Sequence, residues 1–133
     1  MNVTSVIINL TSEDPARLQK FYREVVGLPP QEGMGEGALI LSAGATLIFD
    51  GHSETHGPTK EPQRVLLDLF VEDLAAEQRR LEGQGVKFIR SAGQEYWGGV
   101  ISTFLDPDGN YCQLMEFRPE LAQPEPAAAA TNS

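Results

Sequence analysis

Apolar residues recur with helical spacing between Asp14 and Gly27, and this is the strongest periodic signal in the chain. Asp14 is of a type that caps helix N-termini, Pro15 suits the first helical position, and Gly27 is a typical stop. The spacing i, i+3, i+4, i+7 and i+8 places one set of side chains on a single helix face: Leu18, Phe21, Tyr22, Val25 and Val26. We therefore predict an amphipathic helix that packs this face against another element.

Short runs rich in β-branched and apolar residues predict the strands. The first half of the chain has a strand at 3–10, the helix, a poorly defined second strand, and a hairpin formed by 38–42 and 45–49. The second half has a strand at 64–71, a helix at 72–85, a strand at 86–89, and a hairpin formed by 100–105 and 111–117. The order of strand, helix and three strands occurs twice, which indicates an internal duplication.

This repeat predicts one domain at residues 1–118, with a first module at about 3–60 and a second at about 61–118. The last hairpin turns at DPDG, where Pro107 suits the first central position and Gly109 can adopt a left-handed conformation. Residues 119–133 are rich in Pro and Ala without apolar periodicity, so we expect a disordered tail there.

Alternation along each predicted strand separates a core face from a cleft face. In residues 64–71 one side is uniformly apolar: Val65, Leu67, Leu69 and Val71. The other side carries Leu66, Asp68 and Phe70, a mixture typical of a partly solvated cleft with apolar walls and a few polar groups. Over all strands the predicted cleft residues are Ser5, Ile7, Asn9, Thr46, Ile48, Asp50, Leu66, Asp68, Phe70, Tyr111, Gln113, Met115 and Phe117. The first strand also permits the opposite assignment.

Two aromatic residues precede a pair of glycines in the segment EYWGG. A loop of this composition can bring the rings of Tyr96 and Trp97 over the mouth of a cleft, where flat surfaces bind apolar ligands well. The alternative is that Trp97 covers the core or a dimer interface. We include both residues among the candidate ligand contacts.

Composition narrows the class of protein. The chain has 133 residues, of which 41% are hydrophobic and 22% charged, and no run approaches the ~18 apolar residues of a membrane span. We expect a soluble cytoplasmic protein, because the N-terminus does not resemble a secretory signal and the single cysteine, Cys112, fits a reducing compartment. A net charge of -9 with scattered basic residues argues against binding of nucleic acid and is compatible with a cationic ligand.

The doubled order of elements, together with KFYREVVGL, VEDL and FLDPDGNYCQLMEF, resembles the vicinal oxygen chelate superfamily of glyoxalases, bleomycin-resistance proteins and dioxygenases. The resemblance covers about residues 3–118. It implies an α+β fold in which two βαβββ modules form a curled mixed sheet, a cup with helices on its outer face. It also implies a homodimer, since modules of these proteins commonly pair across subunits.

Enzymes of this superfamily bind a divalent metal through side chains from the first and last strands of each module. The matching positions here are Ser5, Ile48, Leu66 and Gln113, and only Gln113 is a good ligand type. We therefore expect no metal and no cofactor. His52 and His56 lie in a loop rich in Gly and polar residues. Their spacing would place them on one face of a helix, but in such a loop it does not indicate a metal site.

Three functions remain open at this point. The first is a binding protein that sequesters an aromatic or cationic natural product, as bleomycin-resistance members do. The second is a metal-free isomerase, cyclase or lyase with Asp68 or Tyr111 as the acid or base. The third is a dimeric interaction module with a vestigial cup. We rank them in that order, with a small hydrophobic or aromatic ligand as the expected partner.

Overall fold

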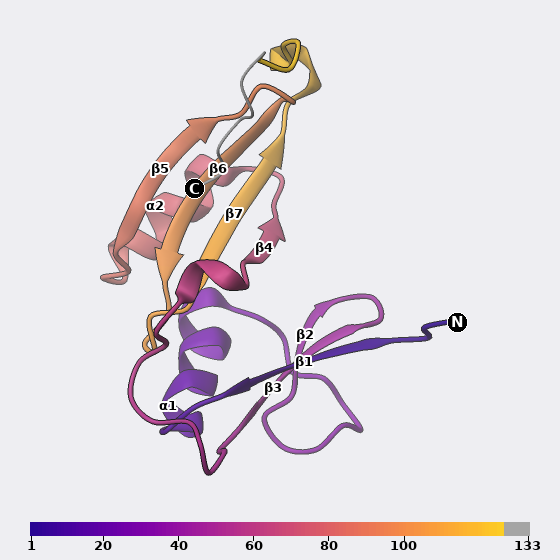
Figure 1. Ribbon diagram of the computed structural model, residues 1–133, viewed down its shortest axis with the longest axis vertical. Coiled ribbons are helices and arrows are strands. Elements are labelled where there is room, and N and C mark those ends of the chain that lie inside the picture. The colour runs from indigo at the N-terminus through magenta and orange to yellow at the C-terminus, as the bar shows by residue number, and fades with distance from the viewer. Residues whose placement is uncertain (127–133) are drawn as a thin grey trace. The chain divides into compact units, whose positions relative to one another are not determined.

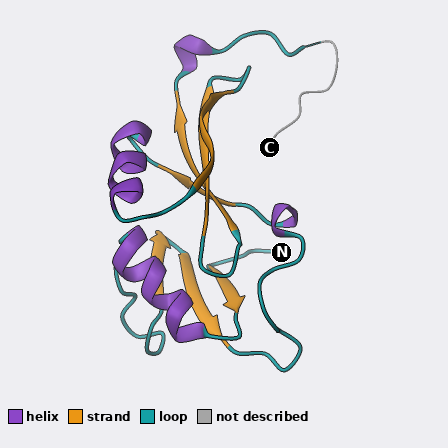
Figure 2. Ribbon diagram, turned by 90° about the vertical axis from the view of Figure 1, so that its left-hand side faces the viewer, coloured by secondary structure: helices purple, strands orange, loops and turns teal. Residues whose placement is uncertain are grey.

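The computed structural model describes residues 1–126 and divides the chain into two compact units, Met1–Pro58 and the residues from Thr59 onward. Each unit contains one mixed sheet with a helix on one side (Figures 1 and 2). This is the α+β architecture that the sequence predicted. No helix in residues 1–126 has both the length and the apolar character needed to cross a bilayer.

The first unit contains β1 (Val6–Thr11), α1 (Pro15–Lys20), η1 (Phe21–Val26), β2 (Leu39–Ser42) and β3 (Ala45–Asp50). The strand order is β1-β3-β2, with β1 parallel and β2 antiparallel to β3. The poorly defined second strand of the sequence is only an isolated bridge between Pro30 and Leu39. Two prolines at 29 and 30 lack N–H donors, which explains why no longer ladder forms there.

The predicted helix boundaries of the first unit are confirmed. The Asp14 carboxylate accepts a hydrogen bond from the Arg17 backbone N–H at 3.1 Å, and Pro15 is the first helical residue. Gly27 ends the helical segment in a left-handed conformation, with φ of 91°. The second half of the helix, η1, is a π-helix, and of the predicted apolar face only Leu18 and Tyr22 are fully buried.

The second unit contains η2 (Pro62–Arg64), β4 (Leu67–Phe70), α2 (Leu74–Gly83), β5 (Phe88–Gln94), β6 (Gly99–Leu105), β7 (Tyr111–Phe117) and η3 (Pro119–Leu121). The strand order is β4-β7-β6-β5, with β4 parallel to β7 and the other pairs antiparallel. The core between sheet and helix includes Leu74, Leu81, Phe104, Cys112 and Leu114. The Cys112 side chain is fully buried in this core.

The sequence placed several strand boundaries wrongly, among them the start of the first strand, which was predicted at residue 3 and lies at Val6. It extended the strand before α2 back to residue 64, whereas residues 62–64 form the turn η2 and β4 begins at Leu67. Val65, predicted to pack in the core, is 74% exposed for this reason. It also ended the next strand at residue 89, whereas β5 continues to Gln94 through two irregularities in its pairing with β6.

The predicted tail at 119–133 begins with contacts to the second unit. The Gln123 backbone N–H donates to the Tyr96 carbonyl at 2.5 Å, and the Tyr96 hydroxyl donates to Glu125 at 3.2 Å. These contacts hold the first residues after η3 beside the β5–β6 connection. Residues 127–133 of the predicted tail lie outside the described residues.

Candidate functional site

A row of polar side chains crosses the second sheet from β4 to β6. Asp68 pairs with Gln113 in the parallel β4–β7 ladder, and Gln113 pairs with Thr103 in the antiparallel β6–β7 ladder. Paired residues of neighbouring strands point to the same face, so these three lie side by side. The Gln113 Nε2 donates to the Thr103 Oγ1 at 3.0 Å, and the two side chains are 3% and 1% exposed. An amide in this strand is therefore accommodated by a hydroxyl partner on the next strand.

The polar row continues to β5, where Arg90 pairs with Thr103 in the ladder. The Arg90 guanidinium lies against Gly93, because a Cβ added to Gly93 would lie only 2.4 Å from the Arg90 Nε. The same guanidinium forms an ion pair with Glu95 at 3.0 Å. Thr103, Arg90 and Glu95 are not among the residues predicted from the sequence. A threonine within the apolar run VISTFL was the available signal, since alternation would have placed Thr103 on the cleft face.

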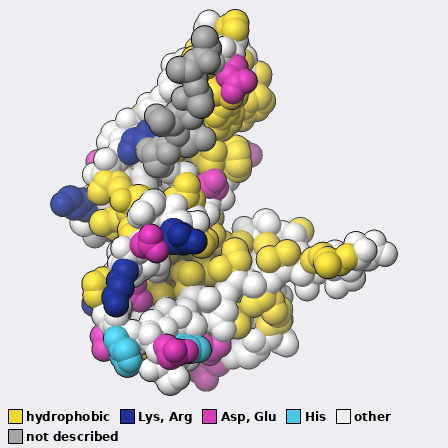
Figure 3. Space-filling view, in the orientation of Figure 1, with side chains coloured by type: hydrophobic (Ala, Val, Ile, Leu, Met, Phe, Trp, Pro, Cys, Tyr) yellow, Lys and Arg dark blue, Asp and Glu magenta, His cyan; other side chains and the backbone are white. Residues whose placement is uncertain are grey.

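Apolar side chains flank this polar row. Met115 pairs with Phe70 on β4 and with Ile101 on β6. Each of these three residues lies two positions along its strand from a member of the polar row, and therefore on the same face. Phe70 is 65% exposed, whereas Met115 is 7% exposed. On the other side of the row, Tyr111 pairs with Leu105. Hydrophobic side chains thus lie over the strands of this sheet (Figure 3).

Trp97 adds an aromatic surface to the same face. Its ring stacks on Phe117 with centroids 6.3 Å apart and planes 21° apart. Phe117 lies on the same face of β7 as Gln113 and Met115, because the three residues occupy every second position of the strand. Gly99 lies under the indole ring, because a Cβ there would approach Trp97 ring atoms to 2.0 Å. The indole is half-buried. The glycine pair after Trp97 therefore lets its ring lie flat across the start of β6.

Tyr96, the other aromatic residue of this loop, is hydrogen-bonded to the segment that follows η3. The Tyr96 carbonyl accepts from the Gln123 N–H, and the Tyr96 hydroxyl donates to Glu125. Desolvation and the neighbouring Glu125 carboxylate raise the pKa of the Tyr96 phenol. The two aromatic residues of EYWGG therefore have different surroundings: Trp97 extends the sheet face with Phe117, and Tyr96 contacts the C-terminal segment.

Comparison with known proteins identifies the family. The sequence model of the Glyoxalase/Bleomycin resistance protein/Dioxygenase superfamily matches residues 5–114. The chain belongs to this superfamily. No curated protein sequence matches it.

Solved structures of superfamily members share the fold. A family enzyme from Burkholderia phytofirmans PsJN is 18% identical with a TM-score of 0.68, covering 88% of this chain and 99% of that one. A member from Nocardioides is 16% identical with a TM-score of 0.69, covering 96% and 91%. At these identities the likeness concerns the fold alone. TnmS3, an antibiotic binding protein from Streptomyces sp. CB03234, is 25% identical with a TM-score of 0.63, covering 88% and 96%.

The residues at the superfamily's metal positions do not fit a divalent cation. The side chains of Ile48 and Leu66 have no atom that can bind a metal, and the Gln113 amide nitrogen donates a hydrogen bond to Thr103. Ser5 and Leu66 each precede the strand on which they were predicted, since β1 begins at Val6 and β4 at Leu67. Within residues 1–126 no three His, Cys, Asp or Glu side chains come together as a metal site.

The predicted cleft face of the first unit is more exposed. Ser5, Ile7, Asn9 and Asp50 are all solvent-exposed, and Ile48 is half-buried. The Asn9 Nδ2 donates to the Asp50 Oδ2 at 2.8 Å. The parity predicted for the first strand agrees with the register, because Ile8 pairs with buried Leu47 and Asn9 pairs with Ile48.

The two loop histidines have ordinary solvent-exposed roles. His52 and His56 are both exposed, and the His52 Nδ1 accepts a hydrogen bond from the Glu54 backbone N–H at 3.0 Å. One imidazole nitrogen of His52 is thereby engaged within its own loop.

Asp68 is the carboxylate on the candidate face of the second unit. Its side chain is exposed to solvent, yet neighbouring atoms displace part of its water, and this desolvation raises its pKa above the ordinary value of 3.8. A raised pKa means that the folded state disfavours the ionised form. Below the unfolded-state pKa the carboxyl is protonated in both states, so no stability is lost. The loss of stability develops as pH rises through the folded-state pKa, and it persists at neutral pH.

We therefore expect Asp68→Asn to stabilise the protein at pH 7 and to have no effect near pH 3. Because the carboxylate is partly solvated, the rise in Tm at pH 7 should be small, about 1–2 °C. Thermal unfolding followed by circular dichroism at the two pH values measures it. Glu72→Gln, at an exposed carboxylate nearby, is the matched control and should leave Tm unchanged. A lower Tm for Asp68→Asn at pH 7 would mean that the carboxylate has a favourable partner.

Proposed function

We propose that this protein binds and sequesters a partly aromatic small molecule, and that it does so without a metal ion or cofactor. The kind of ligand that we propose is a natural product with antibiotic activity, in the manner of a bleomycin-resistance protein. The antibiotic binding protein TnmS3 supports this class of function, because it is related over nearly the whole length of both chains.

The observation that carries the proposal is the composition of the face of the second sheet that is opposite the helix α2. Asp68, Gln113 and Thr103 form one polar row, and apolar or aromatic side chains lie on both sides of it. A binding surface needs apolar area for affinity and a few fixed polar groups for orientation, and it needs no nucleophile. The hydrogen bond between Gln113 and Thr103 holds the amide in a defined orientation for a ligand.

Charge favours a ligand with a cationic group. The chain has a net charge of -9, which raises the local concentration of cations. Asp68 lies beside exposed Phe70, so one ligand can pair a cation with the carboxylate and place a ring on the phenyl side chain. A homodimer in the cytoplasm is part of the same proposal.

Titration of the single tryptophan tests this function. We expect bleomycin, which is cationic, or daunorubicin, a planar quinone antibiotic, to change Trp97 emission saturably, with the same affinity in the presence of EDTA. Gln113→Ala should weaken binding about tenfold, because a ligand polar group loses its partner. Phe70→Ala, at a side chain 65% exposed, should weaken binding without loss of stability. Gln84→Ala, at an exposed glutamine outside the sheet, is the matched control.

The outcomes separate the proposal from its rivals. Unchanged emission and no calorimetric heat with every compound would favour the vestigial interaction module. An affinity lost on adding EDTA would contradict metal independence.

A metal-free enzyme is the second candidate, and the raised pKa of Asp68 beside Gln113 is the observation that favours it. A carboxyl with a raised pKa is better matched to proton transfer near neutral pH than an ordinary one. Tyr111, on the same face, is the other candidate acid or base. Turnover of a bound compound that is lost in Asp68→Asn while affinity is retained would place this function first.

A further inference from the structure

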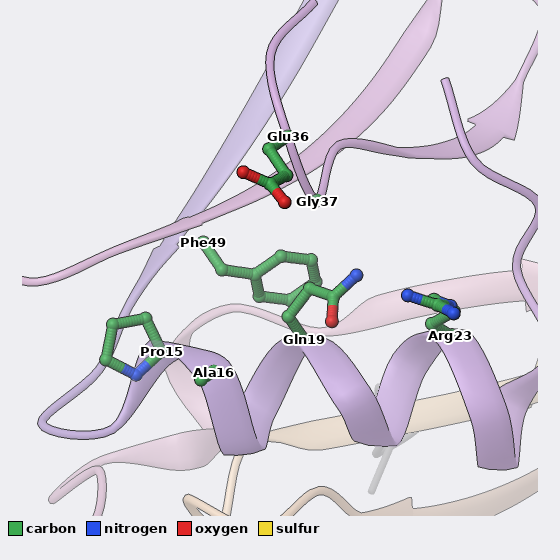
Figure 4. A pocket seen from close by; sticks show the side chains of 7 residues that line it. All are labelled: Pro15, Ala16, Gln19, Arg23, Glu36, Gly37 and Phe49. Atoms are coloured by element: carbon green, nitrogen blue, oxygen red, sulfur yellow. The ribbon is translucent and has the colours of Figure 1, made fainter. Parts of the chain in front are cut away.

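The first unit contains a pocket on the helix side of its sheet, opposite the predicted cleft residues of that same sheet. Its volume is about 320 Å³, and its lining residues are Pro15, Ala16, Gln19, Arg23, Glu36, Gly37 and Phe49 (Figure 4). Phe49 faces the helix, since its ring lies 5.6 Å from the ring of Tyr22, whereas its neighbours Ile48 and Asp50 point to the opposite face of β3. None of these residues was predicted from the sequence to contact a ligand.

The loop at 31–37 forms the outer wall of this pocket. Its ends are joined by backbone hydrogen bonds from Gln31 N–H to the Ala38 carbonyl at 2.8 Å and from Ile40 N–H to the Pro29 carbonyl at 2.7 Å. The glycines at 33, 35 and 37 all have positive φ, a conformation that favours glycine. A Cβ on Gly37 would lie 3.5 Å from the Gln19 Cγ, so the loop lies directly over the helix.

The polar groups of the pocket have opposite charges on its two sides. Glu36 lies above the Phe49 ring, Arg23 lies one helical turn beyond Gln19, and the Gln19 amide lies between the two charges (Figure 4). Within residues 1–126, neither Arg23 nor Glu36 forms an ion pair with another side chain. Each charge is thus available to a group from outside the chain.

We propose that this pocket binds a small zwitterion with a compact apolar body, such as a free amino acid. The carboxylate of the ligand pairs with the Arg23 guanidinium, whose planar donors suit a carboxylate. The ammonium pairs with Glu36, and the apolar body lies on Phe49 and on Pro15. A simple anion would face the Glu36 carboxylate, and a simple cation would face Arg23, so a ligand with both charges is favoured over either. This site shares no residue with the face proposed above for a natural product.

A titration of ¹⁵N-labelled protein by NMR tests the site. L-phenylalanine is the probe, and the Gly37 amide reports on the loop. We expect saturable shifts with a Kd of about 1 mM, because both charges are solvated. Phenethylamine lacks the carboxylate and 3-phenylpropanoate lacks the ammonium, so each should bind about fivefold more weakly than L-phenylalanine.

Two variants complete the test. Arg23→Gln and Glu36→Gln should each weaken L-phenylalanine about fivefold. Arg79→Gln and Glu32→Gln are matched controls, since both residues are exposed and neither lines the pocket, and they should bind as the parent does. Absence of a saturable Gly37 shift up to about 20 mM would overturn the proposal. So would equal binding of all three compounds, or unchanged affinity in both pocket variants. Any of these results leaves the antibiotic titration at Trp97 unaffected.

Discussion

Replacing Asp106 with alanine is expected to lower the free energy of unfolding by about 2–4 kcal/mol. Asp106 opens the DPDG turn and is 4% exposed. Its Oδ1 accepts hydrogen bonds from the backbone N–H groups of Asp108 and Asn110, both at 2.9 Å, and its Oδ2 accepts from the Asn110 Nδ2 at 2.8 Å. Alanine leaves all three donors without this acceptor in a poorly solvated turn, which is why the loss is large.

This turn also sets the register of the candidate site. It joins β6 to β7, and the pairing of Leu105 with Tyr111 directly beside it leads to the pairing of Thr103 with Gln113. We therefore expect Asp106→Ala to weaken ligand binding at the sheet face as well as stability. Urea unfolding followed by circular dichroism measures the stability.

Asp106→Asn is the matched control for this prediction. An asparagine retains a carbonyl oxygen for the two backbone N–H groups and loses only the bond to the Asn110 side chain, so the loss should be about half as large or less. Equal losses for the two variants would indicate that the charge of Asp106, and not its accepting geometry, stabilises the turn.

The second large effect is expected for Phe104→Ala, which should destabilise the protein by about 3–5 kcal/mol. Phe104 lies in β6 with no exposed surface, and its ring is 5.4 Å from that of Phe88 on β5. Its side chain points to the helix side, opposite to Thr103. Truncation leaves a cavity that the rigid strands cannot fill, so the transfer free energy and the packing contacts are both lost.

Phe70→Ala, the same substitution on the exposed face of the same sheet, is the matched control. Phe70 is 65% exposed, so we expect its unfolding free energy to change by less than about 1 kcal/mol. Comparison of the two variants by urea unfolding and by Trp97 titration separates stability from ligand contact. A large loss of stability for Phe70→Ala would show that this face is packed against other protein, as in an interface.

The sequence predicted those features that depend on short-range physics. The Asp14 cap, the Gly27 stop and the left-handed Gly109 follow from conformational preferences of single residues, and all three are present. The alternation in β7 also placed Gln113 and Met115 on one face, with Cys112 and Leu114 on the other. These predictions needed no knowledge of which strands pair.

Partners and boundaries depended on the tertiary structure. Leu66 was predicted as a cleft residue, but β4 begins one residue later, and the register places Asp68 beside Gln113. Arg90 and Glu95 form an ion pair across the part of β5 whose pairing with β6 is irregular. A pairing register is set by contacts between distant segments, which local alternation cannot specify.

By itself, then, the sequence determined the order of elements, their caps and turns, and which residue types alternate on each strand, because these properties arise within a few neighbouring residues. Only the tertiary structure decided that Thr103 is the partner of Gln113 and that the 31–37 loop meets α1 and Phe49 around one pocket. The first arrangement depends on the register of a strand pair, and the second joins residues from separate parts of the chain, so neither follows from the immediate neighbours of one residue.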